Sequence, residues 1–148
     1  IIGVGTILTP QQVIDVQTAG AAFGVSPGLN PDVVNKAKEV AFPFAPGVLT
    51  PSELEKSIGL GCRFVKVFPA EAAGGVTYLK SIYAPYRHLG ISFFPLGGIH
   101  KDNLKDYLHC DGVRAAGGSW LVQAKDVQEE RYDRITERCK AALSNLHL

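Results

Sequence analysis

The stretch Arg63-Phe-Val-Lys-Val-Phe-Pro-Ala-Glu71 places a lysine in the middle of a short apolar run. A run of this length is typical of a buried strand. Because side chains alternate along a strand, Lys66 shares a face with Phe64 and Phe68, and the two valines between them point to the other face. If the strand is central in its sheet, both faces are covered, and the ammonium loses hydration, which lowers its pKa.

A lysine in such a strand has two interpretations. With a lowered pKa, Lys66 is a neutral amine at working pH, and attack on a carbonyl requires a neutral amine. Alternatively, Lys66 pairs with a carboxylate or extends its end to solvent, because structural lysines also occupy such positions. Position alone favours neither interpretation.

Short apolar runs and helical stretches alternate on both sides of this strand. The expected strands are Ile1–Val4, Ala22–Val25, Phe42–Ala45, Arg63–Phe68, Ile91–Phe94 and Val113–Ala116. Helices are expected at about Pro10–Ala19, Asn30–Glu39, from Thr50 onward, Val76–Tyr83, Lys101–Leu108 and Tyr132–Leu143. Several of these helices are preceded by a capping residue and begin with proline, which is a typical start signal.

Strands that alternate with helices form parallel sheets with right-handed helical crossovers. Two architectures fit this pattern: an open doubly wound sheet, and part of a (β/α)8 barrel. The sequence supplies six units, whereas a complete barrel has eight and usually needs at least about 200 residues. No linker or low-complexity segment interrupts the chain, so residues 1–148 are expected to form a single domain.

Two glycine pairs follow the last two expected strands. Gly97-Gly98 comes after one strand, and Gly117-Gly118-Ser119 comes after the next. Glycines let backbone N–H groups approach an anion closely, and in (β/α)8 barrels the loops after the last two strands often bind phosphate. The alternative is that each pair is only a tight turn, for which glycine is the usual residue.

Other polar residues give weaker signals. Gly3-Val-Gly-Thr6 also ends a strand, but Leu8 occupies the third glycine position of the dinucleotide fingerprint. Thr6 therefore either meets substrate at a barrel rim or serves as a turn residue. Glu71 is either an acid or base, or a residue that orients its loop. The histidines form no metal-binding motif; they are His88, His100, His109 and His147.

Composition excludes several classes of partner. Fifteen basic and fourteen acidic residues leave the chain nearly neutral, which argues against nucleic acid or a membrane surface. No apolar run approaches the ~20 residues of a membrane span, and no export signal opens the sequence. Cys62, Cys110 and Cys139 are widely spaced, so reduced thiols in a cytoplasmic protein are expected.

The segment Phe64–Glu71 resembles the Schiff-base lysine segment of the 2-keto-3-deoxy-6-phosphogluconate (KDPG) and 4-hydroxy-2-oxoglutarate (KHG) aldolases. Further motifs similar to those of this family occur in the same order across essentially the whole chain. They are Gly3-Val-Gly-Thr6, Ser26-Pro-Gly28, Pro46-Gly47, Pro95-Leu-Gly-Gly-Ile99, Gly117-Gly-Ser-Trp120 and Tyr132-Asp-Arg-Ile135.

The resemblance implies a (β/α)8 TIM barrel, usually a homotrimer, with no metal or organic cofactor. It implies that Lys66 carries the imine. It also implies that Thr6, Pro46 and Phe68 line the pyruvate half of the site. The residues expected at the substrate phosphate are Gly97, Gly98, Gly117, Gly118 and Ser119.

The sequence departs from the family pattern at two places. The family has two more strand–helix units before Gly3, so this chain is expected to be truncated at its N-terminus and to hold the last six units of the barrel. The family's general base, a glutamate, and an arginine that helps to hold the substrate carboxylate lie in that earlier part. Leu96 stands where phosphogluconate aldolases commonly have threonine, and relatives that act on the galactonate epimer tolerate an apolar residue there.

The primary hypothesis is a class I aldolase that cleaves KDPG to pyruvate and glyceraldehyde 3-phosphate through an imine on Lys66. The nearest alternative is cleavage of unphosphorylated KHG to pyruvate and glyoxylate. Two further alternatives are a non-catalytic phosphosugar-binding barrel and a phosphosugar epimerase, which would need no imine-forming lysine.

Overall fold

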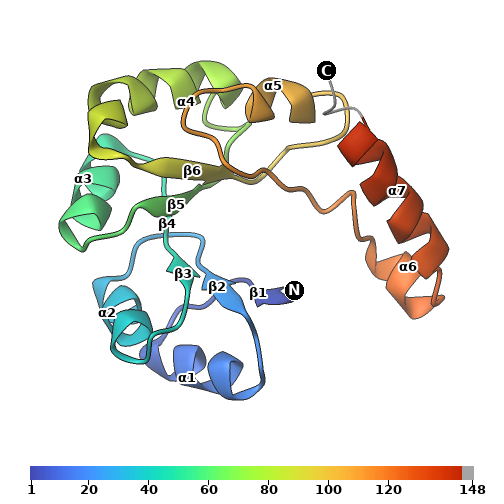
Figure 1. Ribbon diagram of the computed structural model, residues 1–148, viewed down its shortest axis with the longest axis horizontal. Coiled ribbons are helices and arrows are strands. Elements are labelled where there is room, and N and C mark those ends of the chain that lie inside the picture. Colours follow the sequence, from blue (N-terminus) through green and yellow to red (C-terminus); the bar gives the residue numbers. More distant parts are fainter. Residues whose placement is uncertain (145–148) are drawn as a thin grey trace.

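The computed structural model describes residues 1–144 and shows short strands that alternate with helices (Figure 1). The strands are β1 (Gly3–Val4), β2 (Phe23–Val25), β3 (Phe44–Ala45), β4 (Gly47–Val48), β5 (Phe64–Val67) and β6 (Ser92–Pro95). The helices are α1 (Pro10–Thr18), α2 (Pro31–Glu39), α3 (Pro51–Gly59), α4 (Gly75–Tyr83), α5 (Leu104–Leu108), α6 (Ala124–Gln128) and α7 (Tyr132–Ser144), with a 3-10 helix, η1 (Ala84–Leu89), directly after α4.

Local sequence chemistry explains where the first three helices begin. Thr9, Asn30 and Thr50 each accept a backbone N–H bond at the helix start, and a proline follows each of them. The side-chain oxygens satisfy N–H groups that have no partner within the helix. The predicted starts of these helices are therefore confirmed, and so is the start of the last helix at Tyr132.

The strands form two separate sheets rather than one. The first sheet has the order β1-β2-β3 and the second has the order β4-β5-β6, and all pairs are parallel. The predicted parallel pairing of consecutive strands is confirmed. The predicted (β/α)8 barrel is wrong for this structure, because residues 1–144 contain two three-stranded sheets and no closed barrel.

Pro46 explains why the hydrogen-bonded ladder is interrupted. Residues 44–48 are extended, yet Ala45 pairs with Val25 in the first sheet while Gly47 pairs with Lys66 in the second. Pro46 lies between them and has no N–H to donate, so it cannot continue a ladder on that side. Its carbonyl accepts the Lys66 N–H at 2.9 Å and so belongs to the second sheet.

The sixth expected strand is also absent from both sheets. Val113–Ala116 was expected to be a strand, but only Val113 pairs, through a single parallel bridge to Phe93. The segment has β6 on one side and no strand pairs with it on the other among the described residues. Beyond the Val113–Phe93 bridge the segment diverges from β6, so no ladder of consecutive pairs forms in the described part of the chain.

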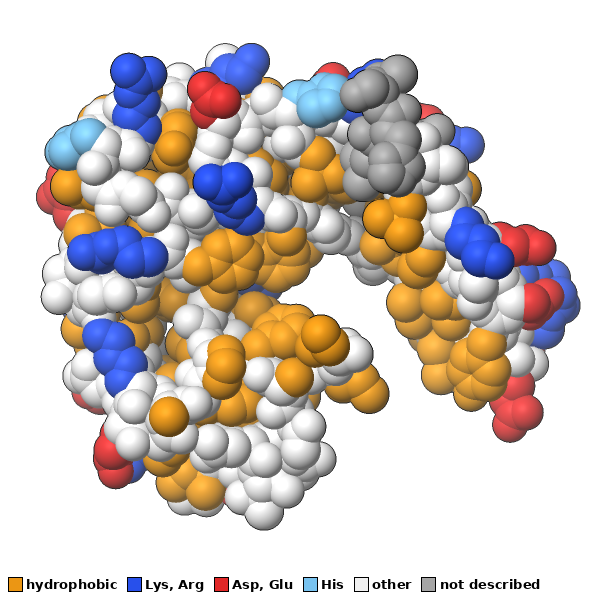
Figure 2. Space-filling model, in the orientation of Figure 1, with side chains coloured by type: hydrophobic (Ala, Val, Ile, Leu, Met, Phe, Trp, Pro, Cys, Tyr) orange, Lys and Arg blue, Asp and Glu red, His pale blue; other side chains and the backbone are white. Residues whose placement is uncertain are grey.

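The two faces of the second sheet differ in burial. Val65 and Val67 are fully buried in the larger hydrophobic cluster, together with Leu54 of α3 and Leu79 of α4. Figure 1 shows α3, α4 and α5 along the outer side of this sheet. The opposite face carries Lys66 and borders the opening at the centre of the molecule, around which hydrophobic side chains gather in Figure 2. The predicted alternation along this strand is confirmed.

The C-terminal helices are set apart from the rest of the chain. In Figure 1, α6 and α7 form an arm that reaches away from the two sheets. Helix α7 buries none of its residues completely. No helix within residues 1–144 has both the length and the apolar character needed to span a bilayer.

Replacing Leu79 by alanine should destabilise the protein strongly. Leu79 is fully buried behind β5, so the substitution leaves a cavity in the larger cluster, and the free energy of unfolding should fall by about 2–5 kcal/mol. The matched control is Leu8→Ala, because Leu8 is 50% exposed and its removal should change the same quantity by roughly 0.5 kcal/mol. Chemical denaturation measures both, and equal losses in the two variants would contradict the described core.

Candidate functional site

Lys66 combines burial with the absence of a counter-charge. Only 8% of the residue is exposed, although it sits on the face of β5 that borders the central opening. Within residues 1–144 its Nζ makes no ion pair and no hydrogen bond. The Phe68 ring lies beneath the amine, and its centroid is 4.6 Å from Nζ. The amine therefore has an aromatic ring rather than a carboxylate as its neighbour among the described residues.

Burial lowers the pKa of the Lys66 amine from its ordinary value. Desolvation is the cause, because a buried ammonium loses hydration that a neutral amine does not need. No carboxylate offsets this effect by stabilising the charged form. The interpretation of Lys66 as a structural ion-pair partner therefore finds no partner in the described part of the chain, and the geometry favours a nucleophilic amine.

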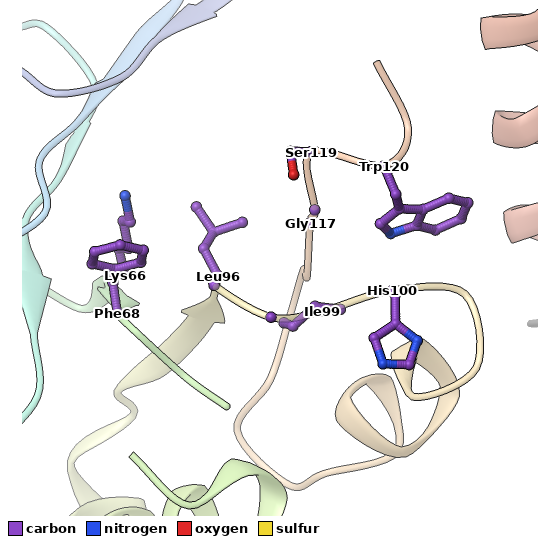
Figure 3. A pocket seen from close by; sticks show the side chains of 11 residues that line it. Lys66, Phe68, Leu96, Ile99, His100, Gly117, Ser119 and Trp120 are labelled. Atoms are coloured by element: carbon purple, nitrogen blue, oxygen red, sulfur yellow. The ribbon is translucent and has the colours of Figure 1, made fainter. Parts of the chain in front are cut away.

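A pocket of about 670 Å³ opens beside Lys66, a size typical of small-molecule sites. Its wall comes from three segments that follow β5, β6 and the Val113 bridge, so it lies at the carboxyl ends of parallel strands, where ligands bind in α/β proteins. Figure 3 shows Lys66 and Phe68 on one side, Leu96 and Ile99 along the middle, and His100 and Trp120 on the other side. The remaining lining residues are Gly97, Gly98, Gly117, Gly118 and Ser119.

Close packing requires glycine in both turns of this pocket. Gly98 has φ of 81°, and a Cβ there would lie 2.5 Å from Cβ of Glu71. A Cβ at Gly118 would lie 2.2 Å from the carbonyl oxygen of Ile99. Both distances are too short for any side chain, so the two turns pack directly against neighbouring chain segments.

The same turns present a cluster of backbone donors. In the part of the chain that the structure describes, no acceptor is bound by the N–H groups of Gly97, Gly98, Gly117, Gly118 and Ser119. All five residues are exposed or partly exposed. A cluster of backbone N–H groups beside a pocket favours a negatively charged ligand. The indole N–H of Trp120 is also buried without a partner among the described residues.

Hydrogen bonds join the lysine segment to the first glycine turn. The N–H groups of Ala70 and Glu71 donate to the carbonyls of Leu96 and Gly97 at 2.8 and 3.0 Å. The Glu71 carboxylate points behind the turn, where it accepts a hydrogen bond from the fully buried Tyr107 hydroxyl. Burial and this hydrogen bond raise the pKa of Tyr107. Glu71 is not among the pocket-lining residues, so the geometry favours its loop-orienting interpretation.

The structure brings most of the predicted site residues together. The pocket is lined by Lys66, Phe68, Gly97, Gly98, Gly117, Gly118 and Ser119. Two predicted residues lie outside its lining. Pro46 is buried and touches the site only through its carbonyl bond to the Lys66 N–H. Thr6 follows β1 in the other sheet, with a positive φ of 61°.

Four lining residues were not among the predicted site residues: Leu96, Ile99, His100 and Trp120. All four adjoin the glycine pairs in sequence, and that adjacency was the available signal. The His100 side chain is 55% exposed, and its Nδ1 lies 3.5 Å from a carboxylate oxygen of Asp102. His147 lies outside the described residues. No cluster of potential metal ligands occurs within residues 1–144.

Comparison with known proteins gives a consistent result. A family model described as KDPG and KHG aldolase matches residues 1–138. The chain is 43% identical to the 2-dehydro-3-deoxy-phosphogluconate aldolase of Haemophilus influenzae, over 91% of the chain and 63% of that protein. It is 43% identical to the KHG/KDPG aldolase of Escherichia coli K12, over 100% of the chain and 68% of that protein. The chain thus spans 63% of the length of the first relative and 68% of the length of the second.

A solved structure has a similar fold over nearly the whole chain. It is the KDPG aldolase of Legionella pneumophila, in which pyruvate was captured at low pH as a covalent carbinolamine intermediate. The identity is 39% and the TM-score is 0.89, and the match covers 95% of this chain and 68% of that one.

Inorganic phosphate should bind at the two glycine turns. Because the free N–H groups there offer hydrogen bonds to an anion, their amide resonances should shift as phosphate is added. The measurement is an NMR titration of the amides of Gly97, Gly98, Gly118 and Ser119, with chloride at matched ionic strength as the control. The Gly61 amide, which donates to the Ile58 carbonyl at 2.8 Å, should not respond. Shifts confined to other amides would show that the turns do not form an anion site.

Proposed function

Because the chain belongs to the KDPG and KHG aldolase family, we propose that it acts as a class I aldolase that cleaves KDPG to pyruvate and glyceraldehyde 3-phosphate. The observation that carries this proposal is a buried lysine without a counter-charge, in a pocket whose other wall presents free backbone N–H groups. The two features match the two ends of the substrate, which are a 2-keto acid and a phosphate ester.

In the first step, the neutral amine of Lys66 attacks the C2 carbonyl and gives a carbinolamine, which loses water to form a protonated imine. The lowered pKa of Lys66 supports this step, because only the unprotonated amine has a lone pair to donate. The Legionella relative holds pyruvate as a carbinolamine, which is the product of such an attack. The Phe68 ring, 4.6 Å from Nζ, shields the amine from water on one side.

In the second step, a base takes the proton of the C4 hydroxyl and the C3–C4 bond breaks. Its electron pair moves to the imine nitrogen, which gives the pyruvate enamine, and C4 leaves as the aldehyde of glyceraldehyde 3-phosphate. Protonation of the enamine at C3 and hydrolysis of the imine then release pyruvate and restore Lys66. The packed turns hold the substrate in the geometry for this cleavage.

The phosphate of the substrate would lie against the turns at Gly97-Gly98 and Gly117–Ser119. Their unpaired N–H groups can each donate to a phosphate oxygen, and such charge-assisted bonds are stronger than neutral ones. Leu96 lies between the lysine and these turns and gives the middle of the pocket an apolar wall (Figure 3). We propose that Thr6 and Pro46 lie near the pyruvate half, although neither is a lining residue.

KHG is a second candidate substrate, because one relative is named a KHG/KDPG aldolase. KHG offers the same 2-keto acid to Lys66 but has no phosphate for the glycine turns. The phosphate contacts should therefore make kcat/KM higher for KDPG than for KHG. Equal values for the two substrates would mean that the turns contribute nothing to substrate choice.

The setting in which the enzyme works is part of the same proposal. We propose a homotrimer in the cytoplasm that needs no metal or organic cofactor, as the family resemblance implies. Cys62, Cys110 and Cys139 are all free thiols, which is compatible with a reducing compartment.

Pyruvate and borohydride should leave a stable adduct on Lys66, because borohydride reduces the imine to a secondary amine. Lys66→Arg should abolish the adduct and lower kcat/KM by on the order of 10³-fold or more, since a guanidinium stays protonated and forms no imine. Peptide mapping by mass spectrometry locates the adduct. Lys80→Arg is the matched control, because Lys80 is exposed on α4 and its replacement should leave both quantities unchanged. Near wild-type cleavage by Lys66→Ala would exclude the imine mechanism.

A further inference from the structure

Arg138 forms a junction between three segments that are separate in the sequence. Its Nη1 donates to the carbonyls of Trp120 and Leu121 at 3.0 and 2.9 Å. Its Nη2 binds a carboxylate oxygen of Asp126. Arg138 lies on α7, Asp126 lies on α6, and the two carbonyls end the turn that carries Gly118 and Ser119. One guanidinium therefore joins both helices of the C-terminal arm to the wall of the pocket.

Burial makes this junction costly to disturb. The Asp126 side chain is 3% exposed and the Arg138 side chain is 23% exposed. Arg134 approaches the other Asp126 oxygen at 3.6 Å, so both carboxylate oxygens have a cationic neighbour. Without Arg138, the carboxylate would lose its closest partner and two carbonyls would lose their donor, and unpaired buried groups are strongly disfavoured.

Apolar packing between the arm and the rest of the chain is partial: Ala142 of α7 and Trp120 of the turn pack against the larger cluster without being fully buried. Helix α7 buries no residue completely, so apolar packing alone holds it weakly. Within residues 1–144, one backbone hydrogen bond closes the turn itself: the Leu121 N–H donates to the Gly118 carbonyl at 3.3 Å. Because Arg138 binds the carbonyls of Trp120 and Leu121, it holds the backbone that directly follows the pocket-lining residues Gly118 and Ser119.

We propose that Arg138, oriented by Asp126, is a positioning residue that holds the Gly118–Ser119 turn in the geometry that binds the substrate phosphate. This inference rests on the proposed aldolase function for its kinetic consequence but not for its binding consequence. Arg138 touches no substrate itself. Its planar guanidinium can serve two carbonyls and a carboxylate at once, whereas a lysine ammonium, which has only three donors and no planar fork, does this poorly.

The test compares Arg138→Lys with Arg134→Lys in the full chain. Both substitutions keep the charge and both affect a partner of Asp126, but within residues 1–144 Arg134 donates to no carbonyl of the turn. Arg138→Lys should raise the Kd for inorganic phosphate roughly tenfold, as measured by NMR titration of the Ser119 amide. It should raise KM for KDPG by a similar factor, with little change in kcat and no change in kcat/KM for KHG. Arg134→Lys should behave as the wild type.

The proposal is overturned if Arg138→Lys binds phosphate like the wild type, or if Arg134→Lys loses as much phosphate affinity as Arg138→Lys. It is also overturned if Arg138→Lys lowers kcat/KM equally for both substrates, as a general structural defect would. Asp126→Asn covers the case in which Arg138→Lys does not fold, because it keeps the side-chain shape and should weaken phosphate binding in the same direction. If the wild type cleaves neither substrate, the aldolase function fails, while the phosphate titration still decides the role of Arg138.

Discussion

The burial of the Lys66 ammonium, which no carboxylate pairs with in the part of the chain that the structure describes, is the constraint on which the site depends. An ion pair would stabilise the charged form and make the lysine inert, whereas desolvation alone favours the neutral amine. Because the folded state holds this pKa below the unfolded value, ammonium burial destabilises the fold at any pH below both values. That cost disappears as pH rises from the folded pKa to the ordinary value of 10.5. The same desolvation that lowers the stability of the fold at these pH values also favours the neutral amine.

The two faces of β5 differ: one face packs into the core through its valines, and the other carries Lys66 toward the pocket. Val65 and Val67 anchor the strand in the core, so the lysine between them cannot turn away from the opposite face. Pro46 adds a second restraint, because its carbonyl accepts the Lys66 N–H and fixes the backbone beside it. The glycine turns form part of the pocket wall that faces Lys66. In the proposed function, the keto acid of the substrate reacts with Lys66 and its phosphate binds these turns.

The sequence predicted the features that depend on local chemistry. Capped helix starts, the alternation along residues 63–68 and the family all followed from short motifs. The predicted barrel was wrong, because the continuity of a sheet depends on hydrogen-bonded pairing between segments that are distant in the sequence. The strand was expected to end at Ala45, yet Gly47 also pairs, with Lys66, nineteen positions further on. Val113–Ala116 has the composition of a strand, yet within residues 1–144 it pairs through a single bridge between Val113 and Phe93.

The same limit applies to the site. Alternation assigned Lys66 to a face, and glycine pairs marked the opposite wall, since both signals lie within a few residues. Trp120 was signalled only by its place beside the second glycine pair, and Arg138 had no signal of this kind. Arg138 meets Asp126 and the turn only because α6 and α7 fold back on each other, and no periodicity in either helix distinguishes this arginine from Arg134.

An NMR titration of the Lys66 side chain, with selectively labelled lysine, tests the central claim most directly. The same residue in the urea-unfolded chain provides the reference and should titrate near 10.4, the value of an unperturbed lysine. In the folded protein, desolvation should move the midpoint clearly below that reference, so that the neutral amine persists to lower pH. Folded and unfolded midpoints that coincide, or a folded midpoint that lies higher, would show that burial does not activate Lys66 and would contradict the account.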